Sequence, residues 1–426
     1  MRRASNLLLW QFFVFVFCAV PAFADWPQFR GPNSSGIAPG ASPPVEFGPG
    51  SNELWKAPMT PGHSSPIVVK DVIFLTTWDK KSRKLAVVCI ARSNGKIRWQ
   101  ADVPATKFEK GHASFNPASS TPATDGERVV AYFGSFGLVC FDMEGKKLWE
   151  RRMPLTKSFG GNATSPAIIG DRVILYRGNY VDHYLLAVDK ATGKELWKVP
   201  QRERFSGEMA CTACPISIGE KLIVHTARSM QAFDISSGER LWVAACATTA
   251  TSTPILSGKE VIVAAWNKLG EPALRPEFPS FEKLLAEHDK DSDKLISRDE
   301  FPTLWLFHRP DGAEAPQNGA TVRFERVDRN RDREIDPGEW AAQLSGLKKF
   351  RAGYKTHGIL AIPLDSSGLV EASKIRTLET QGIPEVPSPL CDGTYVYFVK
   401  NGGVLTCLEL KTGKRIYRMR TKGSGT

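Results

Sequence analysis

Two twelve-residue stretches of the chain carry oxygen-bearing side chains at regular intervals. The first is DKDSDKLISRDE, residues 289–300, with acidic or hydroxyl side chains at positions one, three, five and nine and a glutamate at position twelve. A hard divalent cation such as calcium takes about six to eight oxygen ligands, which a loop of this length supplies by turning alternate side chains inward. The spacing therefore predicts a calcium-binding loop. Its predicted ligands are the side chains of Asp289, Asp291, Asp293, Ser297 and Glu300 and the main-chain carbonyl of Leu295.

A second loop of the same design, DRNRDREIDPGE, occupies residues 328–339. Apolar residues at helical spacing flank both loops, so each loop is expected to join two helices, and two such units predict an EF-hand pair. Ile296 and Ile335 hold the eighth positions, where we expect the loops to pair as a short β-bridge. The alternative is a degenerate pair that folds without metal. The second loop's predicted ligands are Asp328, Asn330, Asp332, Asp336 and Glu339 and the carbonyl of Glu334.

The sixth position of each loop departs from the usual pattern. The backbone there needs a positive φ, which glycine adopts without strain, but this chain has Lys294 and Arg333. A β-carbon in that conformation costs roughly 1 kcal/mol or more. We therefore predict weak binding in at least one loop, with a dissociation constant of about 10⁻⁴ M rather than about 10⁻⁷ M.

The rest of the chain is built from a repeat. Each copy opens with a proline-started strand and a tight turn, and most copies end in a polar turn with glycine and a terminal aromatic residue. The tails are CIARSNGKIRW (89–99), CFDMEGKKLW (140–149), AVDKATGKELW (187–197), AFDISSGERLW (232–242) and CLELKTGKRIY (407–417). A sixth opening, at residues 252–266, has no matching tail directly after it.

Each copy reads as four short antiparallel strands, a sheet that cannot bury both faces alone. Sheets stacked face to face around an axis do bury them, so the fold class predicted is all-β, a β-propeller of four-stranded blades with a small α-helical EF-hand insertion. The tryptophans at the ends of the tails are expected to lie between neighbouring blades. These are Trp99, Trp149, Trp197 and Trp242.

The tails resemble the tryptophan-docking repeats of the quinoprotein (PQQ-like) propeller family. That family includes quinone-dependent alcohol dehydrogenases and the BamB type of outer-membrane assembly lipoprotein. The opening DWPQFRGPNSSG (25–36) is similar to the start of exported PQQ-like repeat proteins of planctomycete-type bacteria. The resemblance covers most of residues 25–269 and 356–420. It implies an architecture more than an activity, because the repeat residues pack blades.

Six blade units are recognisable, whereas the resemblance implies a ring of seven or eight. The stretch NELWKAP (52–58) is expected to be a lone fourth strand that completes the last blade. Either the chain is truncated at its C-terminus or the ring closes with fewer sheets, and we favour truncation.

Four segments follow from these patterns. Residues 1–24 combine a basic start, an apolar run and a small-residue cleavage site, which predicts a secretory signal peptide. Residues 25–269 are the first part of the propeller, residues 270–355 the EF-hand pair, and residues 356–426 the rest of the propeller. The protein is thus expected to be exported to the periplasm or beyond, with no transmembrane segment after cleavage.

Charge and cysteine content narrow the class of protein. Cleavage after residue 24 leaves 54 basic and 45 acidic residues, a modest and scattered excess with no block of five or more like charges. We therefore expect no nucleic-acid partner. Seven cysteines remain, an odd number that excludes complete internal pairing in an exported chain. Cys211 and Cys214 have the spacing of a redox or zinc motif, but a disulfide or small buried residues are the preferred interpretation.

Two functions remain in view. The first is a calcium-binding, non-enzymatic scaffold of the cell envelope that contacts protein or glycan partners through a propeller face. The second is a PQQ-dependent alcohol or sugar dehydrogenase, which the resemblance implies would hold PQQ and calcium on the axis. We prefer the first, because no convincing axial ligand set can be identified and no catalytic residue is predicted. The polar candidates for the axis are His63, His112, Asn116, Asn162 and Arg177.

Overall fold

The computed structural model describes residues 25–203, 212–246, 249–267, 271, 274–308, 319–353, 356–400 and 402–421. The predicted signal peptide, residues 1–24, and Cys211 lie outside this part of the chain. Among the described residues no helix combines the length and the hydropathy needed to cross a membrane.

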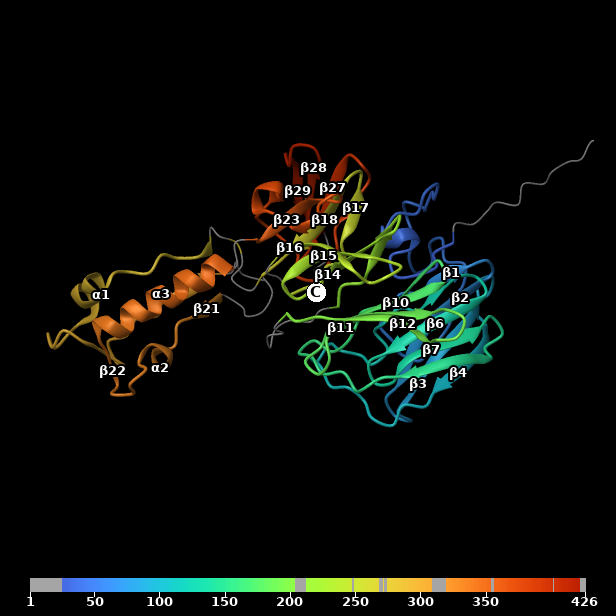
Figure 1. Cartoon of the computed structure of the whole chain (residues 1–426), viewed down its shortest axis with the longest axis horizontal. Coiled ribbons are helices and arrows are strands. Elements are labelled where there is room, and N and C mark those ends of the chain that lie inside the picture. The colour runs from blue at the N-terminus through green and yellow to red at the C-terminus, as the bar shows by residue number, and fades with distance from the viewer. Residues whose placement is uncertain are drawn as a thin grey trace, which may run out of the picture.

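Outside the insert, the described residues form six sheets, each built around four antiparallel strands in sequence order (Figure 1). The first two are β1 (Ile67–Val69), β2 (Val72–Asp79), β3 (Lys84–Ala91) and β4 (Ile97–Val103), then β5 (Ala123–Thr124), β6 (Arg128–Phe133), β7 (Gly137–Asp142) and β8 (Lys147–Arg152). The next two are β9 (Ala167–Ile169), β10 (Arg172–Arg177), β11 (Tyr184–Asp189) and β12 (Glu195–Pro200), then β13 (Ile216–Ile218), β14 (Lys221–His225), β15 (Ser229–Asp234) and β16 (Arg240–Ala245). The last two are β17 (Ile255–Ser257), β18 (Glu260–Ala265), β23 (Gly358–Pro363) and β25 (Arg376–Glu379), then β26 (Leu390–Cys391), β27 (Tyr395–Lys400), β28 (Val404–Glu409) and β29 (Arg415–Arg420).

The third strands of the first three sheets are almost entirely buried, which explains their nearly continuous apolar sequence. The hydrophobic clusters lie between consecutive sheets rather than within one. For example, Phe74 and Val87 of the first sheet pack with Val129 and Phe133 of the second. The other inter-sheet clusters repeat this arrangement along the chain. The prediction of an all-β propeller of four-stranded blades is confirmed.

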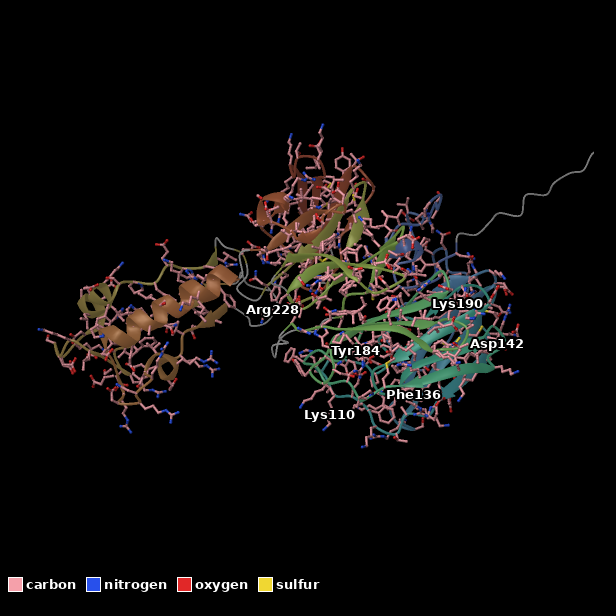
Figure 2. All side chains as sticks on the ribbon, viewed as in Figure 1. Lys110, Phe136, Asp142, Tyr184, Lys190 and Arg228 are labelled. Atoms are coloured by element: carbon pink, nitrogen blue, oxygen red, sulfur yellow. The ribbon has the colours of Figure 1, made fainter. Side chains whose placement is uncertain are left out.

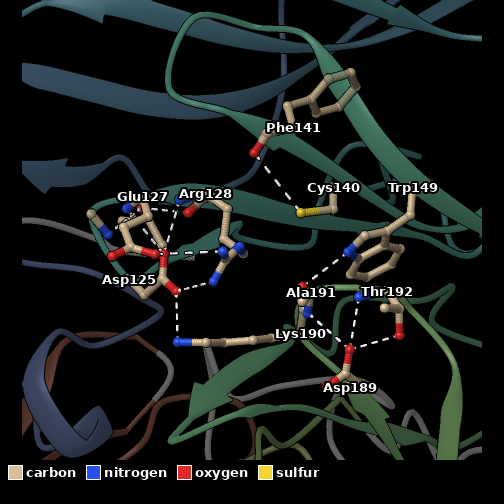
Figure 3. Close-up of polar contacts among 12 residues, drawn as sticks. Asp125, Glu127, Arg128, Cys140, Phe141, Trp149, Asp189, Lys190, Ala191 and Thr192 are labelled. Carbon is tan, nitrogen blue, oxygen red and sulfur yellow. Dashed lines mark hydrogen bonds and ion pairs between the residues drawn. The ribbon is translucent and has the colours of Figure 1, made fainter.

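The terminal tryptophans dock on the following sheet, as predicted. The indole Nε1 of Trp99 donates to the carbonyl oxygen of Met143 at 2.8 Å, and that of Trp197 donates to Ile235 at 3.0 Å. Figure 3 shows the same bond between Trp149 and Lys190, at 2.9 Å. These contacts fix the stacking distance between sheets.

Residues 52–58 are not a strand, contrary to the prediction. Trp55 nevertheless occupies the docking position on the first sheet, because its Nε1 donates to the Arg92 carbonyl at 2.8 Å and its ring covers Gly95. The side chain therefore makes the expected contact without a neighbouring strand to pair with.

A ladder of hydrogen bonds joins the starts of the inner strands. In each case the N–H of a residue that precedes proline donates to the side chain of the equivalent residue in the next sheet. The donor–acceptor distances lie between 2.9 and 3.2 Å. The residues, in order, are Ser65, Thr121, Ser165, Cys214, Thr253 and Ser388.

The segment 25–36 contacts the inner strands of several sheets. Trp26 pairs with Val68 of β1, and the Pro27 carbonyl accepts a bond from Thr124 of β5 at 2.8 Å. The short helix η1 (Pro32–Ser34) packs against β13. Arg30, whose pKa is lowered by burial, donates to the Pro389 carbonyl at 2.7 Å just before β26. This segment thus links sheets that are distant in sequence.

The helical insert interrupts the fifth sheet between its second and third strands. Ala265, the last residue of β18, pairs with Gly358, the first residue of β23, so the insert leaves and re-enters at one corner of the sheet. The fourth strand of this sheet, β25, has Arg376 opposite Ala361, where the third sheet has Trp197 opposite Ala187. The missing tryptophan explains why the tail was not recognised. A short strand in the loop that precedes β25, namely β24 (Gly368–Leu369), extends the fourth sheet in parallel with β16.

Candidate functional site

The insert has its own small core, separate from the inter-sheet clusters, and Figure 1 shows it standing beside the propeller. Its elements are α1 (Phe281–His288), β19 (Ile296–Ser297), β20 (Trp305–His308), β21 (Gly319–Thr321), α2 (Phe324–Val327), β22 (Glu334–Ile335) and α3 (Pro337–Gly353). Ser280 caps α1 by accepting the Lys283 N–H at 3.3 Å. Leu284, Val327 and Trp340 are buried between the helices, so the apolar spacing seen in the sequence faces inward as expected.

Strands β19 and β22 join the two loops. Ile296 lies opposite Ile335 in antiparallel register, and both side chains are fully buried. The predicted β-bridge at the eighth positions is therefore present. It holds the two loops side by side.

The carboxylates of the first loop converge. One ligand oxygen from each of Asp289, Asp291 and Asp293 lies within 4.8 Å of the other two, and this is the only such group of His, Cys, Asp and Glu side chains among the described residues. Glu300 closes the loop by accepting the Lys290 N–H at 2.7 Å and the Ser297 hydroxyl at 2.7 Å. The bond from Lys290, followed by those from Ser297, lowers the pKa of Glu300 to about 2.

The second loop repeats this geometry. Asp328 accepts the Arg331 N–H at 2.6 Å and the Arg333 N–H at 3.2 Å, and Glu339 accepts the Arg329 N–H at 2.7 Å. In the first loop the equivalent Asp289 accepts Ser292 at 2.7 Å and Lys294 at 3.1 Å. Both loops therefore have the same backbone path, with carboxylates turned toward the loop interior.

The sixth positions have the conformation that the sequence predicted. Lys294 has φ of 70° and Arg333 has φ of 77°, both in the left-handed region. The fourth positions, Ser292 and Arg331, also have positive φ, of 64° and 66°. The loops thus follow the required backbone path with non-glycine residues, which are strained in the left-handed conformation.

The donor set fits a hard cation. All predicted ligands are oxygen atoms, and the interior of the first loop brings the carboxylates of positions one, three and five together. Sequence reasoning assigned Glu334 only a carbonyl role. In the structure its carboxylate, which lies opposite Ser297 in the β-bridge, also faces the first loop. Burial and the charges of Asp293 and Asp291 raise its pKa.

A second group of polar residues lies at the corner between strands two and three of the third sheet. Arg177 is fully buried at the end of β10, where it pairs with Asp182 and donates to the Tyr132 hydroxyl at 3.2 Å. Glu109 is buried nearby and accepts a bond from the Thr156 hydroxyl. Burial raises the pKa of Glu109 to about 8. Sequence reasoning missed Glu109, a single acid in a loop without periodicity.

Among the other polar candidates, Asn162 contacts this group through a backbone hydrogen bond to Glu109. His63 and His112 are exposed, and the His112 Nδ1 contacts the Ser114 hydroxyl at 2.9 Å. Asn116 is buried and accepts the Ala118 N–H at 2.8 Å, while Asn162 donates to the Ser120 hydroxyl at 3.0 Å. The two asparagines therefore hold loops in place.

A third polar group lies at the equivalent corner of the fourth sheet. His225 is fully buried, its Nδ1 donates to the Ser252 carbonyl at 2.7 Å, and its Nε2 lies 4.0 Å from the Cys246 sulfur. Burial lowers the pKa of His225 to about 4 and raises the pKa of the Cys246 thiol. A neutral histidine and a protonated, buried thiol do not form a nucleophilic pair. The six described cysteines form no disulfide with one another.

These corners share one face of the propeller with the insert. Strand order is the same in every sheet, so all corners between strands two and three lie at the same end of the axis. Figure 2 places Tyr184, Lys110 and Arg228 toward this end, and Asp142 and Lys190 at the opposite turns. On this face the guanidinium of Arg177, one of the polar candidates for the axis, is already paired with Asp182.

Comparison with known proteins gives a family and a set of related folds. A profile of PQQ-like repeats described as "Outer membrane protein assembly factor BamB" matches residues 46–273, just over half of the chain. No curated protein sequence matches the chain.

Solved structures similar to this chain are distant in sequence. BamB from Moraxella catarrhalis is 12% identical, over 87% of this chain and 77% of that one, with a TM-score of 0.49. The quinohemoprotein alcohol dehydrogenase from Comamonas testosteroni is 13% identical, over 95% of this chain and 74% of that one, with a TM-score of 0.44. A europium-containing methanol dehydrogenase is 11% identical, over 85% and 79%, with a TM-score of 0.39.

Proposed function

Because the chain belongs to the PQQ-like repeat family of the outer membrane protein assembly factor BamB, we propose that it is a non-enzymatic binding or scaffold protein of the cell envelope that binds calcium. The predicted signal peptide at residues 1–24 supports export to the periplasm or beyond. Its partners would be envelope proteins or glycans that contact a propeller face.

The observation that carries this proposal is the use of the polar residues at the inner ends of the sheets. The side chains of Thr121, Ser165 and Thr253 accept bonds from the neighbouring sheet, and Arg30 bonds to the Pro389 carbonyl. These groups therefore stabilise the ring. An active site for a quinone cofactor needs polar side chains that point at the ligand instead.

The calcium part of the proposal rests on the two loops. In the first loop we assign Asp289, Asp291, Asp293 and Glu300 as carboxylate ligands, with the Leu295 carbonyl and Ser297 completing the shell. In the second loop the ligands are Asp328, Asn330, Asp332, the Glu334 carbonyl, Asp336 and Glu339. The cation would neutralise these carboxylates and fix the loops to each other through β19 and β22.

Isothermal titration calorimetry with calcium tests this assignment. The wild-type protein is expected to bind with a dissociation constant of about 10⁻⁴ M, and Glu300→Gln together with Glu339→Gln is expected to remove the heat. As a matched control, Glu127→Gln and Glu144→Gln change two exposed carboxylates in propeller turns. Unchanged calcium binding in the loop variant would contradict the assignment.

The rival function, a PQQ-dependent dehydrogenase, is tested separately. The purified protein is mixed with PQQ and calcium, and the absorbance of bound cofactor and the reduction of an electron-accepting dye with alcohols or sugars are measured. We expect neither signal. Retention of PQQ after gel filtration together with dye reduction would establish the enzyme and overturn the scaffold.

A further inference from the structure

The loops of the insert carry basic side chains at the positions between their ligands. We propose that these side chains form a surface that binds an anionic polysaccharide when the loops hold calcium, an inference that rests on the calcium binding proposed above. The loop surface consists of Lys290, Lys294, Arg329, Arg331 and Arg333, all of which are exposed.

The alternation of charge gives the loops two sides. At odd positions the carboxylates of Asp289 and Asp328 turn inward and accept backbone N–H groups. At even positions the basic side chains point to solvent. Arg329, Arg331 and Arg333 form no ion pair with any carboxylate in the described part of the chain, whereas Arg298 pairs with Glu325 at 2.6 Å. These three arginines are therefore available to an external anion.

Charge counting explains why the surface depends on calcium. Each loop has five carboxylates and three basic side chains, a net charge of −2. One divalent cation neutralises each loop. Without the cation, the net negative charge of the loops repels an anionic partner. With it, the net charge of each loop falls to zero, so the repulsion is removed and the outward-facing basic side chains can contact an anion.

The surface fits a carbohydrate polyanion better than a membrane or a nucleic acid. No large apolar side chain is exposed among the described residues of the insert, so nothing is placed to enter a lipid layer or to stack on unpaired bases. Arginine guanidinium groups match the planar or forked oxygens of carboxylates and sulfates. A chain of sugars bearing such groups contacts several arginines at once, which suits a row of three at alternate positions.

The residue types at the strained sixth positions of the two loops support the same conclusion. Lys294 and Arg333 have positive φ, where glycine would be less strained. Their side chains are exposed and make no hydrogen bond or ion pair within the described part of the chain. A role in binding an external anion gives these basic residues a function at that position.

Fluorescence anisotropy with labelled dextran sulfate tests the proposal on the full-length protein. Binding is measured in calcium, in magnesium and in EGTA. The triple variant Arg329→Gln, Arg331→Gln and Arg333→Gln is compared with a control that removes three exposed basic residues from propeller turns and a strand, Lys146→Gln, Lys194→Gln and Arg240→Gln. Calcium calorimetry is carried out on each protein in parallel, and phosphatidylserine vesicles serve as a second anionic probe.

We expect the dextran sulfate affinity to fall about tenfold or more in EGTA and in the triple variant, and to stay unchanged in the control. Equal losses in both variants, or binding indifferent to calcium, would overturn the inference while calcium binding itself stands. Absence of calcium heat in the wild type would overturn both the inference and the proposed calcium function. Tighter calcium-dependent binding to the vesicles than to dextran sulfate would assign the surface to membranes instead.

Discussion

The indole Nε1 of Trp149 donates to the carbonyl oxygen of Lys190 at 2.9 Å, and the indole ring covers Gly193 in the same turn (Figure 3). The turn residue Lys190 also reaches back to Asp125 of the second sheet, with its Nζ 3.0 Å from the carboxylate. Although burial raises the pKa of Asp125, the bonds from Lys190 and from the backbone lower it overall. Tryptophan, glycine and lysine thus act together to join two sheets.

Gly193→Ala is expected to destabilise the fold more than Gly170→Ala. Both glycines have positive φ, of 70° and 59°, so each substitution costs about 1 kcal/mol in backbone strain. A β-carbon at Gly193 would also lie 2.6 Å from the Trp149 ring, whereas none of the surrounding atoms comes within 4 Å at Gly170. The collision adds about 1 to 3 kcal/mol. Urea unfolding of both variants measures the difference, and equal losses would show that the tryptophan contact is not tight.

The repeat in the sequence predicted this relationship because the same residue types recur at a fixed spacing. Trp99, Trp149 and Trp197 all dock as expected, and each rests on a turn glycine. Where the repeat breaks, the prediction fails. Residues 52–58 have the sequence of a fourth strand but lie beside no third strand, and β25 has the structure of a fourth strand without the tryptophan.

The ladder of inner-strand hydrogen bonds gives a paired test of hydroxyl groups. Thr121 is buried and its hydroxyl accepts the Ser65 N–H at 2.9 Å, so Thr121→Val leaves that N–H without its acceptor. We expect a loss of about 1 to 3 kcal/mol in unfolding free energy.

Thr406 is the matched control for this substitution. It is equally buried, but its hydroxyl has no hydrogen-bond partner among the described residues. Thr406→Val is therefore expected to be neutral or stabilising by up to about 1 kcal/mol. Urea denaturation of both variants gives the comparison. Equal effects would mean that the ladder contributes nothing to stability.

The strained sixth positions of the two loops predict a gain of calcium affinity on substitution by glycine. Lys294→Gly and Arg333→Gly together relieve two positive-φ residues, and each is expected to tighten binding by about fivefold, the equivalent of about 1 kcal/mol. Lys290→Gly, at a position without positive φ, is the control and should not tighten binding. Calorimetric titration with calcium decides, and an unchanged dissociation constant in the double variant would show that strain is not what weakens the loops.

The loops could be predicted from the sequence because each one is a local segment whose ligands are set by spacing. The bridge between Ile296 and Ile335 followed from the same local pattern. Glu109 and Arg177 could not be predicted as neighbours, since a loop before the second sheet and the end of β10 in the third sheet are brought together by the ring. The contacts of Arg30 with the last sheet have the same cause: 359 residues separate the two groups that bond.

Glu109 predicts a pH dependence of stability. Burial of the carboxyl raises its pKa from 4.5 to about 8 in the folded protein, although the contacts with Thr156 and Arg177 offset part of the rise. At pH values between these two pKa values, the folded state therefore keeps a proton that the unfolded chain has lost. Stability falls as pH rises from about 5 to about 8. The loss assigned to this group is roughly 2 to 4 kcal/mol.

Glu109→Gln should remove that loss, because an amide does not ionise. The unfolding free energy of the variant minus that of the wild type is expected to rise between pH 5 and pH 8.5, measured by urea denaturation at each pH. Burial keeps His225 neutral by lowering its pKa to about 4, so both proteins lose stability as the pH falls below 6.5. This loss is the same in both proteins and cancels in the difference. Glu127→Gln, at an exposed carboxylate, is the control. A difference that stays constant with pH would show that Glu109 is ionised throughout this range, with Arg177 as its counterion.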